Sequence, residues 1–251
     1  MKKLILLVAI AAITSCTGVR NNDTTETQLT IDSLKLERKD TLMEITCNLQ
    51  FTTHGGTASD SINASISQHI LDMGRNSNLP EAMRQYVSHT YDQNKDEVTD
   101  MHTQGEYFAD MLYSFDHQGC FLDDTTDSTL TYSVESYLYT GGAHGYHWHT
   151  YLNFSRQTGH LITLDEVLDL SHSEAVIQLI LHDLMQQFNC DNIQQLEDQG
   201  FISIRDITLT DNFHIGSRGI TFVYNPYEIA CYAMGKQSVT LTYQQLKPYM
   251  K

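Results

Sequence analysis

The chain has 251 residues, of which 41% are hydrophobic and 18% charged, with only three prolines. This composition excludes collagen-like, intrinsically disordered and multi-span membrane proteins. Asp and Glu outnumber Lys and Arg by 31 to 15, for a net charge of -16. So acidic a chain has no basic patch to neutralise phosphates, and nucleic acid is not an expected partner.

The first sixteen residues have the pattern of an export signal. Lys2 and Lys3 precede an apolar run over residues 4–13, which is shorter than the roughly 20 residues that span a bilayer. The run ends in Ile-Thr-Ser-Cys, which resembles the lipobox of bacterial lipoproteins. We therefore expect a signal peptide over residues 1–16, a lipid on Cys16, and a membrane-anchored lipoprotein of the cell envelope, facing the periplasm or the surface. The alternative is a soluble export signal cleaved elsewhere.

Residues 17–28 hold one apolar residue among polar ones and predict a flexible tether, with order beginning near Leu29. Four cysteines follow the lipobox, an even number that suits disulfides in an exported chain. Small cysteines buried in the core are the equal alternative, and the pairing stays open. No CxxC pair is present, which argues against a zinc site built from all four thiolates. These cysteines are Cys47, Cys120, Cys190 and Cys231.

Apolar and polar residues alternate over residues 43–51 and predict a strand with one buried face. Apolar residues at helical spacing predict a helix up to Met73, with Asp60 or Ser61 as its cap, and Pro80 suits the first turn of a second helix. Aromatic-rich alternation then predicts three neighbouring antiparallel strands, separated by turns at Gly119, Asp123-Asp124 and Gly141-Gly142. These strands are expected over residues 107–115, 130–139 and 146–154.

Two segments of the C-terminal half, Thr163 to Glu166 and Ser171 to Glu174, fit the capping box and predict two helix starts. Apolar residues at helical spacing over residues 176–188 predict that the second helix packs against a sheet. Strands are expected over residues 207–213, 219–224 and 238–242, and a helical turn over 243–249. The order of elements predicts an α+β fold, with largely antiparallel sheets packed by helices in two lobes or one composite domain.

The sequence lacks the nucleophile elbow, the HExxH zinc motif, the phosphate-binding loop and the dinucleotide-binding glycine motif. The densest group of reactive side chains is His144, His147 and His149, beside Trp148. On a strand His147 and His149 share a face, and with His144 they are candidate zinc ligands. The alternative is a glycine turn that opens an edge strand, with the histidines on its wet face and Trp148 on its packed face.

A second notable segment places Tyr227, Glu228 and Tyr232 in a loop after the Asn225-Pro226 turn. Tyrosine rings with a carboxylate suit sugar or peptide recognition, because the ring stacks while the polar tip forms hydrogen bonds. In the alternative interpretation Tyr227 and Tyr232 are core residues, and Glu228 satisfies backbone amides.

Three segments together resemble the bacterial envelope family DUF3298 (RsiV-like C-terminal): Gly141 to Gly145, Thr163 to Glu166, and Tyr224 to Ala230. The resemblance is specific over about residues 130–249. Over residues 29–130 a DUF4163-like region is suggested by length and element order alone. The sequence departs from the family at Cys231, where proline is common, and at His147 and His149. The implied organisation is a DUF4163-like α+β region over 29–130 and a DUF3298-like α+β domain over 131–251.

The resemblance implies a recognition role at the cell envelope, with a lysozyme-like protein or a wall glycan as the ligand. The candidate ligand-binding residues are His144, Tyr146, Tyr227 and Glu228. The leading hypothesis is a non-catalytic binding module without a cofactor, anchored to the membrane through lipidated Cys16. Two alternatives stay open: a metal-dependent hydrolase of polysaccharides with zinc on His144, His147 and His149, and a structural lipoprotein of an envelope complex.

Overall fold

The structure is a computed structural model that describes residues 29–103 and 112–251. The predicted signal peptide, lipobox and tether lie outside these residues, as does the first part of the strand expected over 107–115. Within the two described ranges, none of the helices is both long and apolar enough to cross a membrane.

The larger sheet has six strands in the order β1-β2-β3-β4-β5-β6. β1 and β2 are antiparallel, β2 and β3 are parallel, and β6 pairs antiparallel with the end of β5. A parallel pair needs a long crossover, which here contains α1 and α2. The strands are β1 (Thr30–Lys39), β2 (Met43–Thr53), β3 (Tyr113–Phe121), β4 (Thr129–Tyr139), β5 (Tyr146–Ser155) and β6 (Leu161–Ile162).

The smaller sheet is antiparallel and has three strands in the order β7-β8-β9. Its strands are β7 (Phe213–Ile215), β8 (Gly219–Tyr224) and β9 (Gln237–Thr242). The helical elements are α1 (Gly56–Ile70), α2 (Leu79–Thr103), α3 (Leu164–Val167), η2 (Leu170–His172), α4 (Ser173–Gln187), α5 (Ile193–Asp198), η3 (Ile204–Asp206), η4 (Tyr232–Met234) and α6 (Tyr243–Leu246). The two sheets and their helices confirm the predicted α+β class.

The chain forms two compact units, and neither is a continuous segment. Unit 1 comprises residues up to Cys120 together with Val134–Tyr146 and Arg156–His160. Unit 2 comprises Phe121–Ser133, His147–Ser155 and Leu161–Lys251. The polypeptide therefore passes between the units within β3, within β4, within β5 and at both ends of Arg156–His160.

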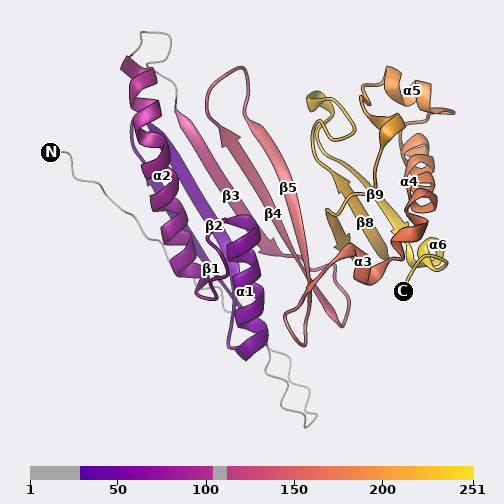
Figure 1. Cartoon of the computed structure of the whole chain (residues 1–251), viewed down its shortest axis with the longest axis horizontal. Helices are drawn as coiled ribbons and strands as arrows, with labels where there is room; N and C mark the ends of the chain where they lie inside the picture. The colour runs from indigo at the N-terminus through magenta and orange to yellow at the C-terminus, as the bar shows by residue number, and fades with distance from the viewer. Residues whose placement is uncertain (1–28, 104–111) are drawn as a thin grey trace. The chain divides into compact units, whose positions relative to one another are not determined.

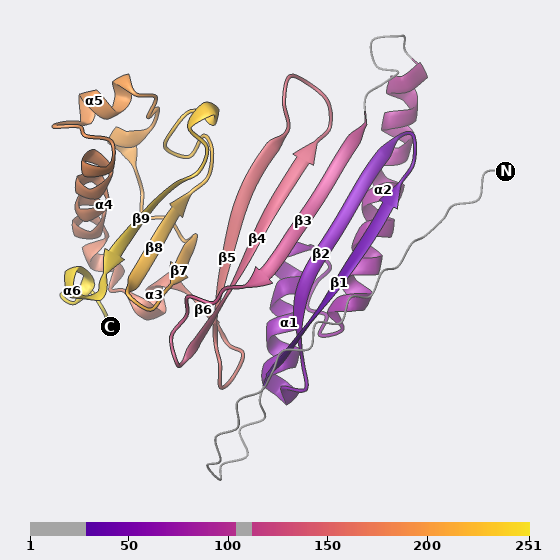
Figure 2. The same ribbon diagram turned by 180° about the vertical axis from the view of Figure 1, so that it is seen from behind.

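In unit 1, α1 and α2 lie against the same face of β1 and β2 (Figure 1). Figure 2 shows the strands from behind, in front of these helices. The alternation read from residues 43–51 explains this packing, because Met43, Ile45 and Leu49 are all fully buried. Each buried side chain of this size contributes about 1.5–3 kcal/mol to the free energy of unfolding.

In unit 2, α4 packs on β9 and α6 contacts β8 and β9. The periodic positions of α4 supply Val176, Ile180 and Leu184 to the core, where they meet Phe222 of β8 and Val239 of β9 in one buried cluster. The smaller sheet thus has one face covered by helix, as the apolar spacing predicted.

The structure differs from the sequence prediction at two helix starts. α1 begins at Gly56, before Asp60 and Ser61, because Thr52 of β2 engages its first turns: Thr52 Oγ1 donates to the carbonyl of Ser59 at 3.2 Å. Ser171 does not cap α4, because Asp169 accepts the Ser171 N–H at 3.1 Å and the chain first makes the 3-10 turn η2. The other predicted capping box is present at Thr163, whose N–H donates to Glu166 at 2.8 Å.

The strands differ from the sequence prediction at three further points. Gly119 is not a turn, because it lies within β3 opposite Leu49 of β2. The strand expected over residues 207–213 forms instead as β7 at Phe213–Ile215. β1 was not predicted, although ten of its residues pair in register with β2. By contrast, residues 219–224 form β8 with the predicted bounds.

Candidate functional site

The segment that joins β8 to β9, residues 225–236, carries most of the features expected of a recognition site; we refer to it as the β8–β9 connection (Figure 1). It begins with a tight turn after Tyr224. The Asn225 N–H donates to the Glu228 carboxylate at 2.8 Å, and the Glu228 N–H donates back to the Asn225 carbonyl at 3.1 Å. The Tyr227 N–H closes the turn on the Ala230 carbonyl at 2.9 Å. The carboxylate and the N–H of Glu228 therefore both bond to the backbone of Asn225. This agrees with the interpretation in which Glu228 satisfies a backbone amide.

Tyr227 projects from this turn rather than into the core. Its side chain is 49% exposed, and its ring stacks on Tyr232 with centroids 5.7 Å apart and planes 28° apart. Its backbone φ is +72°, in the left-handed region that a tyrosine rarely adopts. The interpretation of Tyr227 as a core residue is therefore wrong. A strained backbone that holds an exposed ring is a feature typical of functional positions.

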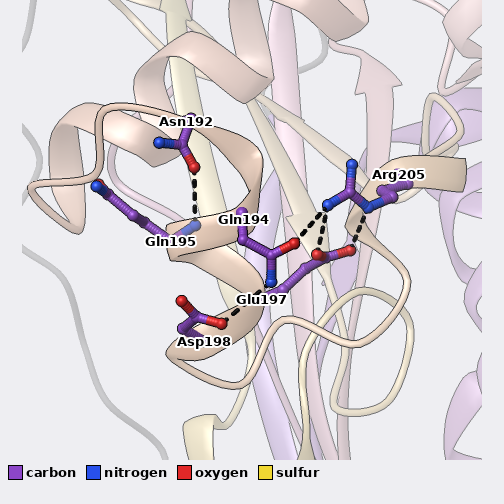
Figure 3. A network of polar contacts seen from close by, with 6 residues as sticks. All are labelled: Asn192, Gln194, Gln195, Glu197, Asp198 and Arg205. Atoms are coloured by element: carbon purple, nitrogen blue, oxygen red, sulfur yellow. Dashed lines mark hydrogen bonds and ion pairs between the residues drawn. The ribbon is translucent and has the colours of Figure 1, made fainter.

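A polar network at α5 and η3 stabilises the neighbouring loop (Figure 3). Arg205 donates from Nε and Nη2 to the two carboxylate oxygens of Glu197, both at 2.6 Å, and also from Nη2 to Gln194 at 3.0 Å. Asn192 caps α5 through the N–H of Gln195 at 3.1 Å. Bidentate Arg–carboxylate pairs are rigid as well as strong. The network holds the loop that carries exposed Ile202.

That loop is joined directly to the β8–β9 connection. The Ile202 N–H donates to the carbonyl of Ile229 at 3.0 Å, and the Cys231 N–H donates to the carbonyl of Gly200 at 2.9 Å. Phe201 and Ala230 form a bridge between the two segments, and both are buried. The connection thus lies on a buried support, while Tyr227 is exposed.

Two asparagines connect the smaller sheet to β5. Asn225 Oδ1 accepts the N–H of His149 at 2.7 Å, and its Nδ2 donates to the carbonyl of the same residue at 3.1 Å. Asn212 accepts the N–H of Tyr151 at 3.0 Å and donates to the His149 carbonyl at 2.9 Å. We call Asn212 and Asn225 the asparagine clamp. It satisfies backbone groups of β5 that would otherwise lack a neighbouring strand.

Lys236 lies one residue before β9, beside this clamped part of β5. Its Nζ is 3.4 Å from Nδ1 of His149 and 3.4 Å from the hydroxyl of Tyr151, and 5.9 Å from the centre of the Tyr151 ring. An ammonium can only donate, so in these two contacts the His149 nitrogen and the Tyr151 oxygen are the acceptors. No pattern in the sequence connects Lys236 with His149, because the two are far apart along the chain.

The ring of Tyr151 also stacks on the ring of buried His214, with centroids 6.2 Å apart and planes 19° apart. His214 Nε2 lies 2.6 Å from the carbonyl oxygen of Asp124. Hydrogen bonds from Ser217, one of them from its N–H at 3.0 Å, lower the pKa of the Asp124 carboxyl. These contacts join His214 and Ser217 to Asp124.

Two candidate residues, His144 and Tyr146, belong to unit 1. The glycines before them form the predicted turn, with φ of +100° at Gly141 and +93° at Gly142. His144 Nδ1 is 2.9 Å from the carbonyl of Gly145, and Tyr146 is 37% exposed. His147 and His149 belong to unit 2, so the three histidines do not lie in one compact unit.

Nδ1 of His149 accepts from an ammonium, so a metal on that nitrogen would have to displace Lys236. In the part of the chain that the structure describes, no group of three or more His, Cys, Asp or Glu side chains is arranged to hold a metal ion. Cys47, Cys120, Cys190 and Cys231 all lie in the described part of the chain, and no disulfide joins them there. β5 also differs from the expected edge strand, because the asparagine clamp occupies its outer side at His149 and Tyr151.

Comparison with known proteins identifies the domain that carries the site. Residues 168–244 match the family model described as "Protein of unknown function (DUF3298)". This range contains the whole β8–β9 connection, and it confirms the DUF3298 domain expected from the sequence. No curated protein matches the chain. The suggested DUF4163-like region stays a prediction.

Two solved structures have the same fold. A DUF3298 family member from Bacteroides fragilis superimposes with a TM-score of 0.81 at 23% identity, covering 91% of this chain and 96% of its own. A DUF3298 family protein from Pseudomonas aeruginosa superimposes with a TM-score of 0.64 at 16% identity, covering 90% of this chain and 96% of its own. The chain is thus an α+β protein with a DUF3298 domain and a fold shared with these two proteins.

Proposed function

We propose that this protein is a lipid-anchored binding module of the cell envelope, which recognises a wall glycan through the β8–β9 connection of its DUF3298 domain. The observation that carries the proposal is the exposed ring of Tyr227, which stacks on the half-buried ring of Tyr232. The lipobox at Cys16 supports the location at a membrane surface.

The tyrosine pair suits a sugar ring for physical reasons. A flat aromatic face covers the apolar C–H face of a pyranose, while nearby hydroxyl groups form hydrogen bonds with the sugar. Tyr227 is held in place by the Glu228 and Ala230 contacts of the turn, so its ring loses little conformational entropy on binding. Glu228 acts in this scheme as a positioning residue, because its carboxylate accepts a backbone N–H.

A second candidate ligand, a basic lysozyme-like protein, is favoured by the net charge of -16. Acidic surfaces accelerate encounter with basic proteins, and they also cause nonspecific attraction at low salt. Salt separates the two effects, since screening removes long-range attraction but not a docked contact.

The test is calorimetric titration of the full-length protein with a tetrasaccharide of alternating N-acetylglucosamine and N-acetylmuramic acid. The informative variant is Tyr227→Asn, because asparagine tolerates the left-handed backbone and the turn is kept. Loss of one stacking ring is expected to weaken binding about tenfold, from roughly 0.5–1.5 kcal/mol of aromatic contact in addition to the lost burial.

The matched control is Leu170→Asn, which removes another exposed apolar side chain (41% exposed) of unit 2 from outside the connection and should leave the affinity unchanged. Equal affinity of the Tyr227 variant and the unmodified protein would contradict the proposal. Saturable binding of lysozyme that persists above physiological salt, with no binding of the tetrasaccharide, would replace the glycan by the second candidate ligand.

A further inference from the structure

We propose that Tyr151 and Lys236, the last residue of the β8–β9 connection, form a subsite for a single carboxylate of the ligand. The inference rests on the proposed glycan recognition and names the chemistry of that glycan: a saccharide that carries a carboxylic acid rather than a neutral one.

The donors of the subsite follow from its hydrogen bonds. Lys236 has three N–H groups and donates two of them, one to Nδ1 of His149 and one to the hydroxyl oxygen of Tyr151, each at 3.4 Å. One N–H remains for a ligand. The Tyr151 hydroxyl accepts from Lys236, which leaves its own hydrogen available to donate. Two neighbouring donors, one of them charged, match the two oxygens of a carboxylate.

The subsite is held in place by its surroundings. The asparagine clamp fixes the main chain of His149 through contacts of 2.7 to 3.1 Å, and the N–H of Tyr151 is held by Asn212 at 3.0 Å. The Tyr151 ring also stacks on His214. A site whose donors are already oriented loses less entropy on binding than a lysine moving freely in solvent.

Charge balance favours a monoanion. Several other cations of the described residues pair with carboxylates, among them Lys35 with Glu37, Lys39 with Glu44, and Arg205 with Glu197. The partners of Lys236 in that part of the chain, His149 and Tyr151, carry no charge that neutralises it. One ammonium balances one carboxylate, whereas a polyanion would be repelled by a protein of net charge -16.

The experiment compares the disaccharide of N-acetylglucosamine and N-acetylmuramic acid, which carries one carboxylate, with its methyl ester, in which that charge is removed, by calorimetry on the full-length protein. The acid is expected to bind about tenfold more tightly than the ester. Lys236→Gln should reduce the affinity for the acid to that of the ester and leave the ester affinity unchanged. Lys236→Arg should retain most of the preference, and Tyr151→Phe should lose part of it while keeping the ring.

The matched control is Lys247→Gln, an exposed lysine just after α6, which should leave the preference unchanged. Equal binding of acid and ester, or an equal loss of both in Lys236→Gln, would overturn the subsite while leaving glycan recognition intact. Absence of binding of both saccharides would overturn the proposed glycan recognition itself, and with it the subsite. Binding of the ester by the unmodified protein therefore distinguishes the two failures.

Discussion

His117 is a residue whose protonation is strongly affected by folding. It lies in β3 with 7% of its surface exposed, its Nδ1 is 2.7 Å from the Ser136 hydroxyl, and its ring centroid is 5.0 Å from that of Tyr86. Burial lowers its pKa to about 4, because the charged imidazolium loses its hydration. The histidine is thus neutral in the folded protein at every pH well above that value.

This shift predicts acid destabilisation. Below about pH 6.5 the unfolded chain takes up a proton at His117, whereas the folded protein does so only near pH 4. The free energy of unfolding should fall by about 3 kcal/mol through that window from this residue alone. Urea unfolding at a series of pH values from 7 to 4 measures this change in the free energy of unfolding. His117→Leu should flatten the pH dependence, and His182→Gln, at an exposed position of α4, should not. An unchanged slope in the His117 variant would contradict this assignment.

At the scale of elements, the asparagine clamp decides how the smaller sheet meets β5. Asn225 and Asn212 between them bond the backbone N–H and carbonyl of His149 and the N–H of Tyr151. Asn153 of β5 completes the contact, because its side chain donates to the Phe213 carbonyl at 2.8 Å and accepts the Ile215 N–H at 3.0 Å. Side-chain amides thus replace part of a strand pairing.

Asn225→Ala is therefore expected to be destabilising. The substitution leaves the His149 N–H without its acceptor, at a cost of about 1–3 kcal/mol in the free energy of unfolding. Asn225→Asp should recover part of the loss, because a carboxylate accepts that N–H but cannot donate to the carbonyl. The midpoints of urea unfolding measure the stability of both Asn225 variants, and Gln186→Ala, on the exposed side of α4, is the control. A midpoint for Asn225→Ala equal to that of the control would show that the clamp carries no stability.

Elements with a strong local pattern were predictable. Residues 43–51 alternate and form most of β2, and residues 219–224 form β8. The misplaced elements are those whose bounds depend on distant partners. β7 forms at Phe213–Ile215, where Asn153 bonds both its ends, rather than over the residues with apolar character before it. Gly119 remains in a strand because β2 pairs with it.

At the scale of the whole molecule, the expected attachment to a membrane depends on one residue. Cys16→Ser removes the lipidated atom, so the protein should move from the membrane fraction to the soluble fraction on cell fractionation, while a retained signal peptide still exports it. Cys231→Ser, at a half-buried cysteine of the β8–β9 connection, is the control and should stay with the membrane. Unchanged partition of the Cys16 variant would contradict the lipid anchor.

The sequence by itself determined the properties that depend on composition and short-range pattern. Net charge, the absence of common catalytic motifs and the α+β class follow from residue types and their spacing. The resemblance to DUF3298 is confirmed over residues 168–244, which include the Tyr224 to Ala230 segment. It also singled out Tyr227 and Glu228, because a turn with aromatic and acidic residues is recognisable locally.

The tertiary structure alone decided which of these residues meet. Lys236, His149 and Tyr151 lie on β5 and the β8–β9 connection, and neither segment contains a pattern that indicates the other. The side of the turn on which Tyr227 emerges was likewise open in the sequence, since the same residues fit a core position. Long-range pairing fixes such contacts, because the hydrogen bonds of Asn225 and the bridge between Phe201 and Ala230 exist only once distant segments are packed together.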